Sequence, residues 1–357
     1  MLKDNSASAN TESYKDNQEI IKGITNGYMP TIEEVSNILR DEEITEYLIN
    51  TADSVRKHYA GDEIYLRAII EFSNYCRCKC LYCGLNCKNQ NVKRYRMPIE
   101  EIISVSKEAI DAGYGSIVFQ SGEDPWYTSE KLCTIVKEVK KYKDIGITMS
   151  IGERTYAEYE KLKAAGCDRF LLKHETADEK IYNYLHPHSN FQERIRCLKD
   201  LKNSGYQVGS GFMIGLPNQT YETIAKDVLI LKELDVSMAG IGPFIAHKDT
   251  ELKDSSNGSP ELTFKAVALA RILIKNINLP ATTSLETIDK NKRDRIFSAG
   301  ANVIMKKVEP YKYRKLYEIY PKELGKEKSI KEERLELEEF IKSLGRTVSS
   351  NKGDLLK

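Results

Sequence analysis

Three cysteines stand close together in one short segment of this 357-residue chain. Cys76, Cys80 and Cys83 have the spacing C-x3-C-x2-C within the segment CRCKCLYC. Three thiolates on one loop can bind three corners of a cubane 4Fe–4S cluster, because cysteine thiolates are the usual ligands of such clusters. The iron at the fourth corner then lacks a protein thiolate and can bind a chelating ligand. The spacing therefore predicts an iron–sulfur site with one open iron.

Other cysteine chemistries fit the sequence less well. A structural zinc site needs four nitrogen or sulfur ligands, usually as two separated pairs. Three further cysteines are single, in helical or strand patterns, and we interpret them as small buried hydrophobic residues: Cys133, Cys167 and Cys197. A ferredoxin-like site would use Cys87 as fourth ligand, but Lys88 rather than proline follows it and there is no second cysteine set. Cys78 and Cys87 are left as bystanders or as ligands of a damaged cluster.

The cysteine spacing resembles the motif of the radical S-adenosylmethionine (SAM) superfamily. This resemblance implies that the open iron binds the amino and carboxylate groups of SAM. It also implies that Tyr82, directly before the third cysteine, shields the cluster. Because a three-cysteine motif also arises by chance, the elements around it have to supply the expected context.

Segments typical of buried strands alternate with amphipathic helical patterns from residue 64 onward. We expect strands at about 64–72, 116–120, 145–151, 168–173, 206–214, 236–241, 279–285 and 301–305. Helices such as 98–112, 129–142 and 220–234 lie between them, and several end at a glycine, as helix C-caps do. This alternation predicts an α/β protein with a complete parallel (βα)8 TIM barrel.

The rest of the chain divides around this barrel. We expect a disordered polar tail over 1–17, N-terminal helices over 18–62 that close the bottom of the barrel, the radical SAM barrel over 63–306, and a C-terminal helical extension over 307–357. Thr31 and Glu34 are spaced as a capping box at the start of an N-terminal helix.

Composition narrows the classes of function. The 54 Lys and Arg residues are balanced by 53 Asp and Glu residues, so nothing favours binding to nucleic acid or an anionic membrane. No apolar run approaches the ~20 residues of a membrane span, and the first residues lack the apolar core of a secretion signal. Clustered cysteines without an export signal favour the cytoplasm and a metal site over disulfides.

Polar residues follow the predicted strands, at the end of a (βα)8 barrel where the chemistry takes place. The cysteine loop follows the first strand, and Gln120, Ser121, Gly122 and Glu123 follow the second. Gly122 and Glu123 occupy the place of the superfamily's glycine–glutamate motif, which meets the SAM amino group; Ser121 replaces its first glycine. We expect all four at the cofactor, because Gly122 permits close backbone approach and Glu123 or the neighbouring backbone carbonyls can accept hydrogen bonds from an ammonium.

Later strand ends supply further candidate SAM contacts. We expect Ser150 and Glu175 to contact the ribose hydroxyls or the methionyl amine, and Met213 to line the adenine side. Arg194 can pair with the SAM carboxylate in a bidentate fork. The structural alternatives are that Arg194 is a surface arginine and that Glu175 is an acceptor for Lys173.

Two arginines in the predicted barrel strands indicate a small anionic substrate. An unpaired guanidinium is costly inside a barrel, so Arg67 and Arg169 need an anion or a carboxylate partner. The alternative is an ion pair with a barrel carboxylate such as Glu71. The other residues expected at the substrate are Thr148, Thr282, Thr283 and Tyr313.

Several longer segments resemble the HydE family of radical SAM maturases of FeFe hydrogenase, from about residue 55 to residue 320. They are EFSNYCRCKCLYCG, KRYRM, QSGEDP, DRFLLKHET, GLPNQT, GIGPFIAHKDT, PATTSL and GANVIM. The resemblance implies an oxygen-sensitive enzyme that cleaves SAM to a 5′-deoxyadenosyl radical and helps to assemble the diiron subcluster. It further implies a cysteine-bound iron carbonyl–cyanide substrate, other hydrogenase maturases as partners, and an electron donor such as a ferredoxin or flavodoxin.

The resemblance can be carried over by position. The three motif cysteines match the cluster ligands of the family, and its SAM contacts are matched by Ser150, Glu175 and Arg194. The family's anion-lined cavity is matched by Arg67, Arg169, Thr282 and Thr283. The chain also departs from the family. Some members bind an accessory 2Fe–2S cluster through C-terminal cysteines, whereas no cysteine follows Cys197 here, so we expect none. His186 and Lys173 stand where the family often has arginine.

Two alternatives remain open on the sequence. Methylornithine synthase, a radical SAM mutase, shares the Arg-Tyr-Arg motif, a Gly-Glu-Asp-Pro stretch and a segment like Asn86–Asn89. A non-catalytic iron–sulfur scaffold of hydrogenase assembly is the second alternative.

Overall fold

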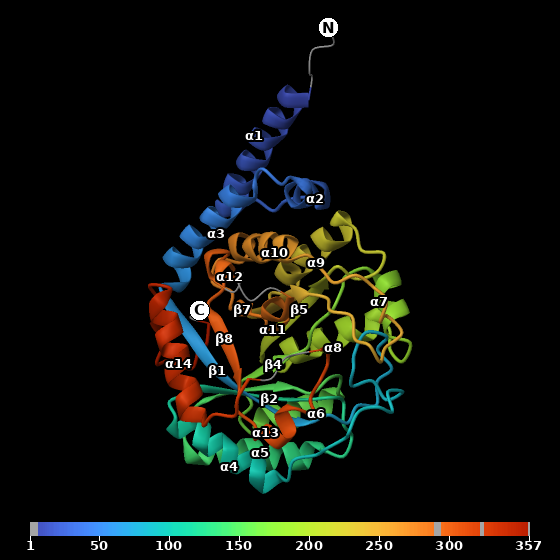
Figure 1. Cartoon of the computed structure of the whole chain (residues 1–357), viewed down its shortest axis with the longest axis vertical. Helices are drawn as coiled ribbons and strands as arrows, with labels where there is room; N and C mark the ends of the chain where they lie inside the picture. The colour runs from blue at the N-terminus through green and yellow to red at the C-terminus, as the bar shows by residue number, and fades with distance from the viewer. Residues whose placement is uncertain (1–5, 289–293, 322–324, 356–357) are drawn as a thin grey trace.

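The computed structural model describes residues 6–288, 294–321 and 325–355. Its centre is a parallel sheet that curves into a barrel (Figure 1). The hydrogen-bonded neighbours follow the order β6-β5-β4-β3-β2-β1-β8-β7. The strands are β1 (Glu63–Ser73), β2 (Ser116–Ser121), β3 (Gly146–Ser150), β4 (Arg169–Leu171), β5 (Gln207–Ile214), β6 (Met238–Pro243), β7 (Pro280–Ala281) and β8 (Val303–Lys307). The predicted (βα)8 barrel is confirmed.

The barrel is almost closed where β6 meets β7. A single parallel bridge joins Met238 to Asn278 there, and the Ala239 amide donates to the Asn278 carbonyl over 3.0 Å. The strand expected over 279–285 is much shorter, because β7 gives way to helix α11 (Thr283–Ile288). Pro280 has no N–H for the ladder, which suits a strand this short at the seam.

Helices surround the barrel because each has one apolar face. In α5 (Ser129–Tyr142) the buried residues Leu132, Ile135, Val136 and Val139 recur at helical spacing. The other barrel helices are α4 (Ile99–Asp111), α6 (Tyr156–Ala164), α7 (Glu179–Leu185), α8 (Phe191–Asn203), α9 (Tyr221–Glu233), α10 (Pro260–Leu273) and α12 (Arg295–Ser298). These helices fix where each strand-end loop begins.

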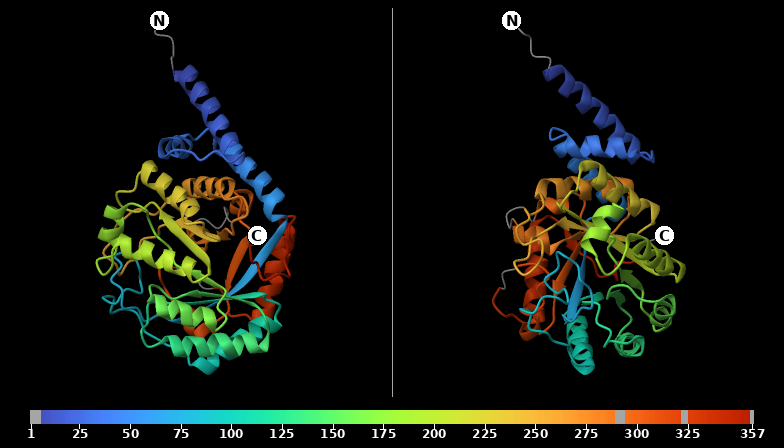
Figure 2. Two further views of the ribbon diagram at one scale, coloured as in Figure 1. Left: turned by 180° about the vertical axis from the view of Figure 1, so that it is seen from behind. Right: turned by 90° about the vertical axis from the view of Figure 1, so that its right-hand side faces the viewer.

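The N-terminal region is more helical than predicted. Residues 6–17, expected to be a disordered tail, belong to α1 (Ser6–Thr25), which projects from the body (Figures 1 and 2). Asn17 is buried and its amide donates to Asp41 over 2.9 Å, so tertiary contact holds the second half of this helix. The capping box of Thr31 and Glu34 at α2 (Ile32–Arg40) is confirmed.

The N-terminal helices do not close the bottom of the barrel. Helix α2 packs against α9, and α3 (Thr45–Ala60) against α10, on the outer ring. Lys265 of α10 fixes the end of α2 by donating to the carbonyls of Leu39 and Asp41, over 3.1 and 2.6 Å. The expectation that they cap the barrel was therefore wrong.

The C-terminal region contains α13 (Tyr311–Arg314), α14 (Ile330–Ser343) and an unpredicted strand β9 (Thr347–Val348), parallel to β1. Residues 349–355 then lie across the N-terminal ends of the barrel strands. The Gly353 carbonyl accepts from Arg67 and Asn278, and the Leu355 amide donates to Gln207. This segment, and not the N-terminal helices, covers that opening.

Among the described helices none is long and apolar enough to cross a bilayer.

Candidate active site

The cysteine loop lies at the C-terminal end of β1 and is fixed by backbone hydrogen bonds to three distant segments. The amides of Arg77, Leu81 and Gly84 each donate over 3.0 Å, to the carbonyls of Glu123, Leu185 and Ile319 respectively. These bonds place the loop beside the residues after β2, the end of α7 and a C-terminal segment around Ile319. The loop is therefore part of the barrel rim that the sequence predicted.

Gly122 is required where the rim passes the cysteine loop. A Cβ at this position would lie 2.3 Å from the Tyr75 carbonyl oxygen and 2.7 Å from the Cys76 Cβ. Any larger residue would push the loop away from β2. The lack of space for a side chain, and not backbone flexibility, therefore explains why residue 122 is a glycine.

The donor set of the loop fits a 4Fe–4S cluster. Cys76, Cys80 and Cys83 are partly buried free thiols, and burial raises the pKa of Cys83 to about 12. A hydrogen bond with Cys78, together with burial, raises the pKa of Cys76. In the described residues no three His, Cys, Asp or Glu side chains converge on a single-ion site, whereas a cubane takes one thiolate at each of three irons. Binding would displace the thiol protons, as it does at other metal sites.

The remaining cysteines have different settings. Cys78 is buried and its thiol is hydrogen-bonded with Cys76 and Cys80, whereas Cys87 is exposed. Cys167 and Cys197 are buried, as predicted, but Cys133 is only partly buried. Cys78 therefore lies among the candidate ligands, whereas Cys87 is exposed to solvent.

His186 holds the aromatic residue of the motif. Its Nδ1 is 2.8 Å from the Tyr182 carbonyl oxygen, and its Nε2 is 3.0 Å from the Tyr82 hydroxyl. Burial lowers the pKa of His186 to about 3, so the ring is neutral. Nδ1 then donates to the carbonyl and Nε2 accepts from Tyr82. The replacement of the family arginine thus leaves Tyr82 held by a neutral partner.

His188 contacts a predicted cluster ligand, a role that no sequence motif indicated. Its Nδ1 accepts from the Lys79 amide over 3.2 Å, and its Nε2 lies 4.0 Å from the Cys80 sulfur. Because the backbone N–H can only donate, a neutral ring carries its proton on Nε2. His188 therefore directs an N–H at Cys80.

The last residues of β2 and β3, and the residues that follow these strands, meet at the rim. Gln120 and Ser150 are register partners, and the Ser121 hydroxyl donates to the Gly122 carbonyl over 2.7 Å. Glu123 accepts from the Glu153 amide over 2.8 Å and from the Arg77 guanidinium over 3.1 Å. The Glu123 carboxylate is therefore occupied within the protein.

Arg194 is buried and paired rather than being a surface arginine. Its Nε donates to Glu153 over 2.7 Å and its Nη1 donates to the Lys173 carbonyl. The pKa of Arg194 is raised against the effect of burial, chiefly by the charges around it, including Glu153. Glu153 has no assigned role in the motifs, and this contact with Arg194 assigns it one. Neither contact uses Nη2.

Glu175 has a strained backbone, with φ of 62°. Its amide donates to the Gly211 carbonyl over 3.0 Å, and its carbonyl accepts from the Met213 amide over 3.1 Å. Its carboxylate lies 3.0 Å from the Lys173 ammonium, which is the structural alternative raised by the sequence. The preceding His174 is buried and bonded to Ser210 over 2.9 Å, which helps to hold this conformation.

Arg67 and Arg169 lie at the other end of the barrel from the cysteine loop. Arg169, at the start of β4, pairs with Asp354, and its Nη2 donates to the Lys352 carbonyl over 2.8 Å. Arg67 donates to Gly353, as described above, while Glu71 pairs with Lys307 instead. The alternative of a carboxylate partner therefore holds for Arg169, with Asp354 in place of Glu71. The expected contact of Arg67 and Arg169 with a substrate inside the barrel stays a prediction. Thr148, the register partner of Arg169, has no hydrogen-bond partner for its hydroxyl among the described residues.

Thr282 and Thr283 line a cavity of about 780 Å³ between β7, β8 and the C-terminal helices. Tyr313 turns away from it: its hydroxyl donates to Glu101 of α4 over 2.7 Å. Two other tyrosines of the same segment lie closer to the expected residues. Tyr317 is buried and hydrogen-bonded with Gln120, and Tyr320 is hydrogen-bonded with Thr283. The sequence around Tyr317 and Tyr320 gave no reason to prefer either of them to Tyr313 as a residue near the substrate.

Comparison with known proteins identifies the family. Residues 70–231 match the Radical SAM superfamily model. The chain is 48% identical over 283 residues to the FeFe hydrogenase maturase subunit HydE of Thermotoga maritima, across 79% of this chain and 81% of that protein. The chain belongs to the HydE family of radical SAM enzymes.

Other relatives of this HydE-family chain share the fold. It is 32% identical over 268 residues to 3-methylornithine synthase of Methanosarcina acetivorans, across 74% of this chain and 75% of that protein. The crystal structure of methylornithine synthase (PylB) has a TM-score of 0.81 at 26% identity, covering 92% of this chain and 97% of that one. The crystal structure of the maturase HydG has a TM-score of 0.79 at 22% identity, covering 96% and 79%, which indicates a shared fold alone.

Proposed function

We propose that this enzyme cleaves SAM reductively and acts in assembly of the diiron subsite of FeFe hydrogenase. The observation that carries the proposal is the 48% identity to HydE over most of both chains. The rim geometry supports it, because the three cysteines and the residues expected at SAM meet at the C-terminal ends of β1 to β5.

The contacts of individual residues support the following roles. Cys76, Cys80 and Cys83 would hold the cluster, which when bound supplies the electron that splits SAM into methionine and a 5′-deoxyadenosyl radical. Arg194, held by Glu153, is positioned to offer its remaining guanidinium N–H groups to the SAM carboxylate. The rim carbonyls beside Gly122 accept hydrogen bonds from the methionyl amine, since Glu123 is already engaged with Arg77.

We further infer the finer features of the reaction from the family. The substrate is a small anionic organometallic species, a cysteine-bound iron carbonyl–cyanide precursor, supplied by another hydrogenase maturase. Thr282 and Thr283 line the 780 Å³ cavity and contact this substrate from the barrel side. The chain carries one cluster, because no cysteine follows Cys197. A ferredoxin or flavodoxin in the cytoplasm supplies the electron.

A second candidate is mutase chemistry of the methylornithine synthase type. It is favoured by the 32% identity to that enzyme and by the TM-score of 0.81. The two candidates share SAM cleavage and differ in the substrate of the radical.

Two measurements test these proposals. The anaerobically reconstituted protein should form 5′-deoxyadenosine from SAM with dithionite, and absence of the nucleoside from a fully loaded protein would refute the radical reaction. Adding the protein to a maturation system that lacks HydE should restore hydrogenase activity. Conversion of lysine instead, detected by mass spectrometry, would favour the mutase.

A further inference from the structure

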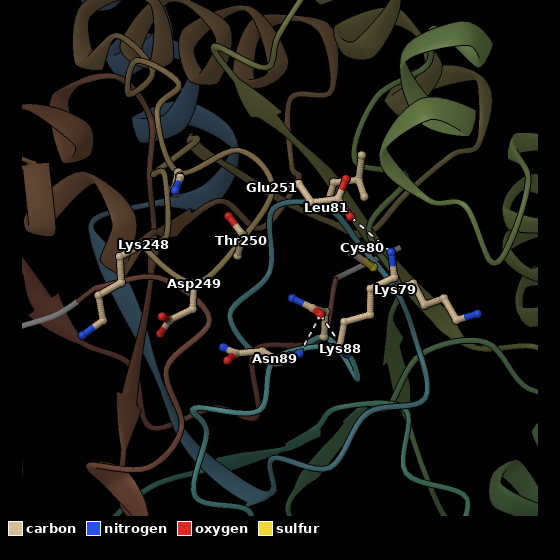
Figure 3. A pocket seen from close by; sticks show the side chains of 11 residues that line it. Lys79, Cys80, Leu81, Lys88, Asn89, Lys248, Asp249, Thr250 and Glu251 are labelled. Atoms are coloured by element: carbon tan, nitrogen blue, oxygen red, sulfur yellow. Dashed lines mark hydrogen bonds and ion pairs between the residues drawn. The ribbon is translucent and has the colours of Figure 1, made fainter.

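A pocket of about 310 Å³ opens beside the cysteine loop, on the outside of the barrel mouth. Figure 3 shows it between residues 79–89 of the cysteine loop and residues 248–253, which follow β6. Cys80, a predicted cluster ligand, is among the residues that line it. The pocket therefore brings solvent to the edge of the cluster site.

The rim of this pocket is positively charged. Four exposed lysines surround it, Lys79 and Lys88 from the cysteine loop and Lys248 and Lys253 from the facing loop. The two acidic residues there, Asp249 and Glu251, balance half of this charge; Glu251 pairs with Lys88 over 3.2 Å. This local excess contrasts with the chain as a whole, whose net charge is only +1.

Next to the pocket, the cysteine loop is covered by apolar packing. Leu81 lies in a buried cluster with Leu185, Leu216 and Phe244, against which Tyr82 packs. An external protein cannot approach the loop through this cluster. The lysine-rimmed pocket is thus a short route from solvent to Cys80, and electron transfer slows steeply with distance.

We propose that the pocket lined by Lys79, Lys88, Lys248 and Lys253 is the docking face for an acidic one-electron carrier protein. This inference rests on the proposed SAM cleavage and adds to it the surface through which the electron arrives. Opposite charges steer such encounters and raise the association rate at low salt. Redox partners form small, short-lived interfaces, so a compact charged rim is sufficient.

The test compares a protein reductant with a chemical one. In the reconstituted enzyme, Lys248→Glu with Lys253→Glu reverses two charges on the loop that carries no cysteine. A reduced acidic ferredoxin should then drive 5′-deoxyadenosine formation about tenfold more slowly at low salt, with a weaker dependence on salt. Dithionite needs no docking, so the rate with dithionite should be unchanged. Lys137→Glu with Lys199→Glu, on exposed positions of α5 and α8, is the matched control and should change neither rate.

The outcomes separate the inference from the proposed function. Equal ferredoxin-driven rates in the pocket variant, the control variant and the unaltered enzyme would overturn the docking face. The docking face would also be overturned if the dithionite-driven rate fell as much as the ferredoxin-driven rate, both in this variant and in Lys79→Glu. The substitutions would then have altered the cluster and not the encounter with a partner. If the unaltered enzyme makes no 5′-deoxyadenosine with dithionite, the proposed reaction itself fails.

Discussion

At the scale of single residues, the contacts around the cysteines say more than the motif does. The motif names three candidate ligands, whereas His188 contacts Cys80 and His186 contacts Tyr82. An N–H directed at a ligating sulfur stabilises the more negative, reduced state of a cluster. His188 is therefore placed to tune the cluster.

We expect His188→Leu to lower the midpoint potential of the cluster, because the N–H directed at Cys80 is lost. His188→Gln keeps a side-chain donor and should restore part of the difference. The measurement is a redox titration followed by EPR at matched iron content. The exposed His58 supplies the control variant His58→Leu, and a shift of equal size there would contradict the role.

A second residue-scale prediction separates ligands from bystanders. Cys83→Ala removes one of three thiolates and should abolish both the 4Fe–4S spectrum and SAM cleavage. Cys87→Ala should leave both unchanged, since Cys87 is exposed. Iron and sulfide analysis with UV–visible spectra decides the matter; loss of the cluster in Cys87→Ala would instead indicate a fourth thiolate ligand.

At the scale of elements, the C-terminal segment has the least expected position. Residues 349–355 cover the N-terminal barrel opening and supply the partners of Arg67 and Arg169. A buried guanidinium is costly without such partners. The segment thus accounts for two arginines that otherwise suggest an anionic substrate.

We expect Asp354→Ala to lower the free energy of unfolding by about 1–3 kcal/mol, because Arg169 loses its carboxylate. The effect stays below that of a fully buried pair because the Asp354 side chain is 43% exposed. Urea denaturation measures it. Lys352→Ala breaks the exposed pair with Asp144 and should cost roughly 0–1 kcal/mol; equal losses in both variants would argue against the buried pair.

At the scale of the whole molecule, charge is balanced and pH acts through particular buried groups. With 54 basic and 53 acidic residues, net repulsion is small near neutral pH. Burial, followed by the charge of Glu71, raises the pKa of Glu309 to about 8, against the opposing effects of Lys307 and Arg314. Between about 4.5 and 8 the folded chain therefore holds a proton that the unfolded chain releases.

We expect the free energy of unfolding to fall as pH rises from 5 towards 8.5, because ionising Glu309 in the fold is unfavourable. At roughly 1.36 kcal/mol per pKa unit, the contribution is on the order of a few kcal/mol. Glu309→Gln should flatten this part of the curve, measured by urea denaturation at several pH values. An unchanged slope in that variant would assign the pH dependence to other groups.

Much of the molecule was predictable from the sequence because the signals are local. The barrel follows from short apolar segments that alternate with helical periodicity, and the spacing of Cys76, Cys80 and Cys83 places the three candidate ligands on one loop. Helix α5 begins and ends at the expected residues, since its cap and its apolar face are written in adjacent positions.

The remaining features required the tertiary structure, because they join residues that are far apart in the chain. Only folding brings Glu153 to Arg194, His188 to Cys80 and Tyr317 to Gln120. Only folding shows that Asp354 neutralises Arg169, which in the sequence is as consistent with a bound anion as with an ion pair. Spacing along the chain determines which groups share a loop or a helix face; which charges neutralise one another depends on distances through space, and the closed barrel sets those distances.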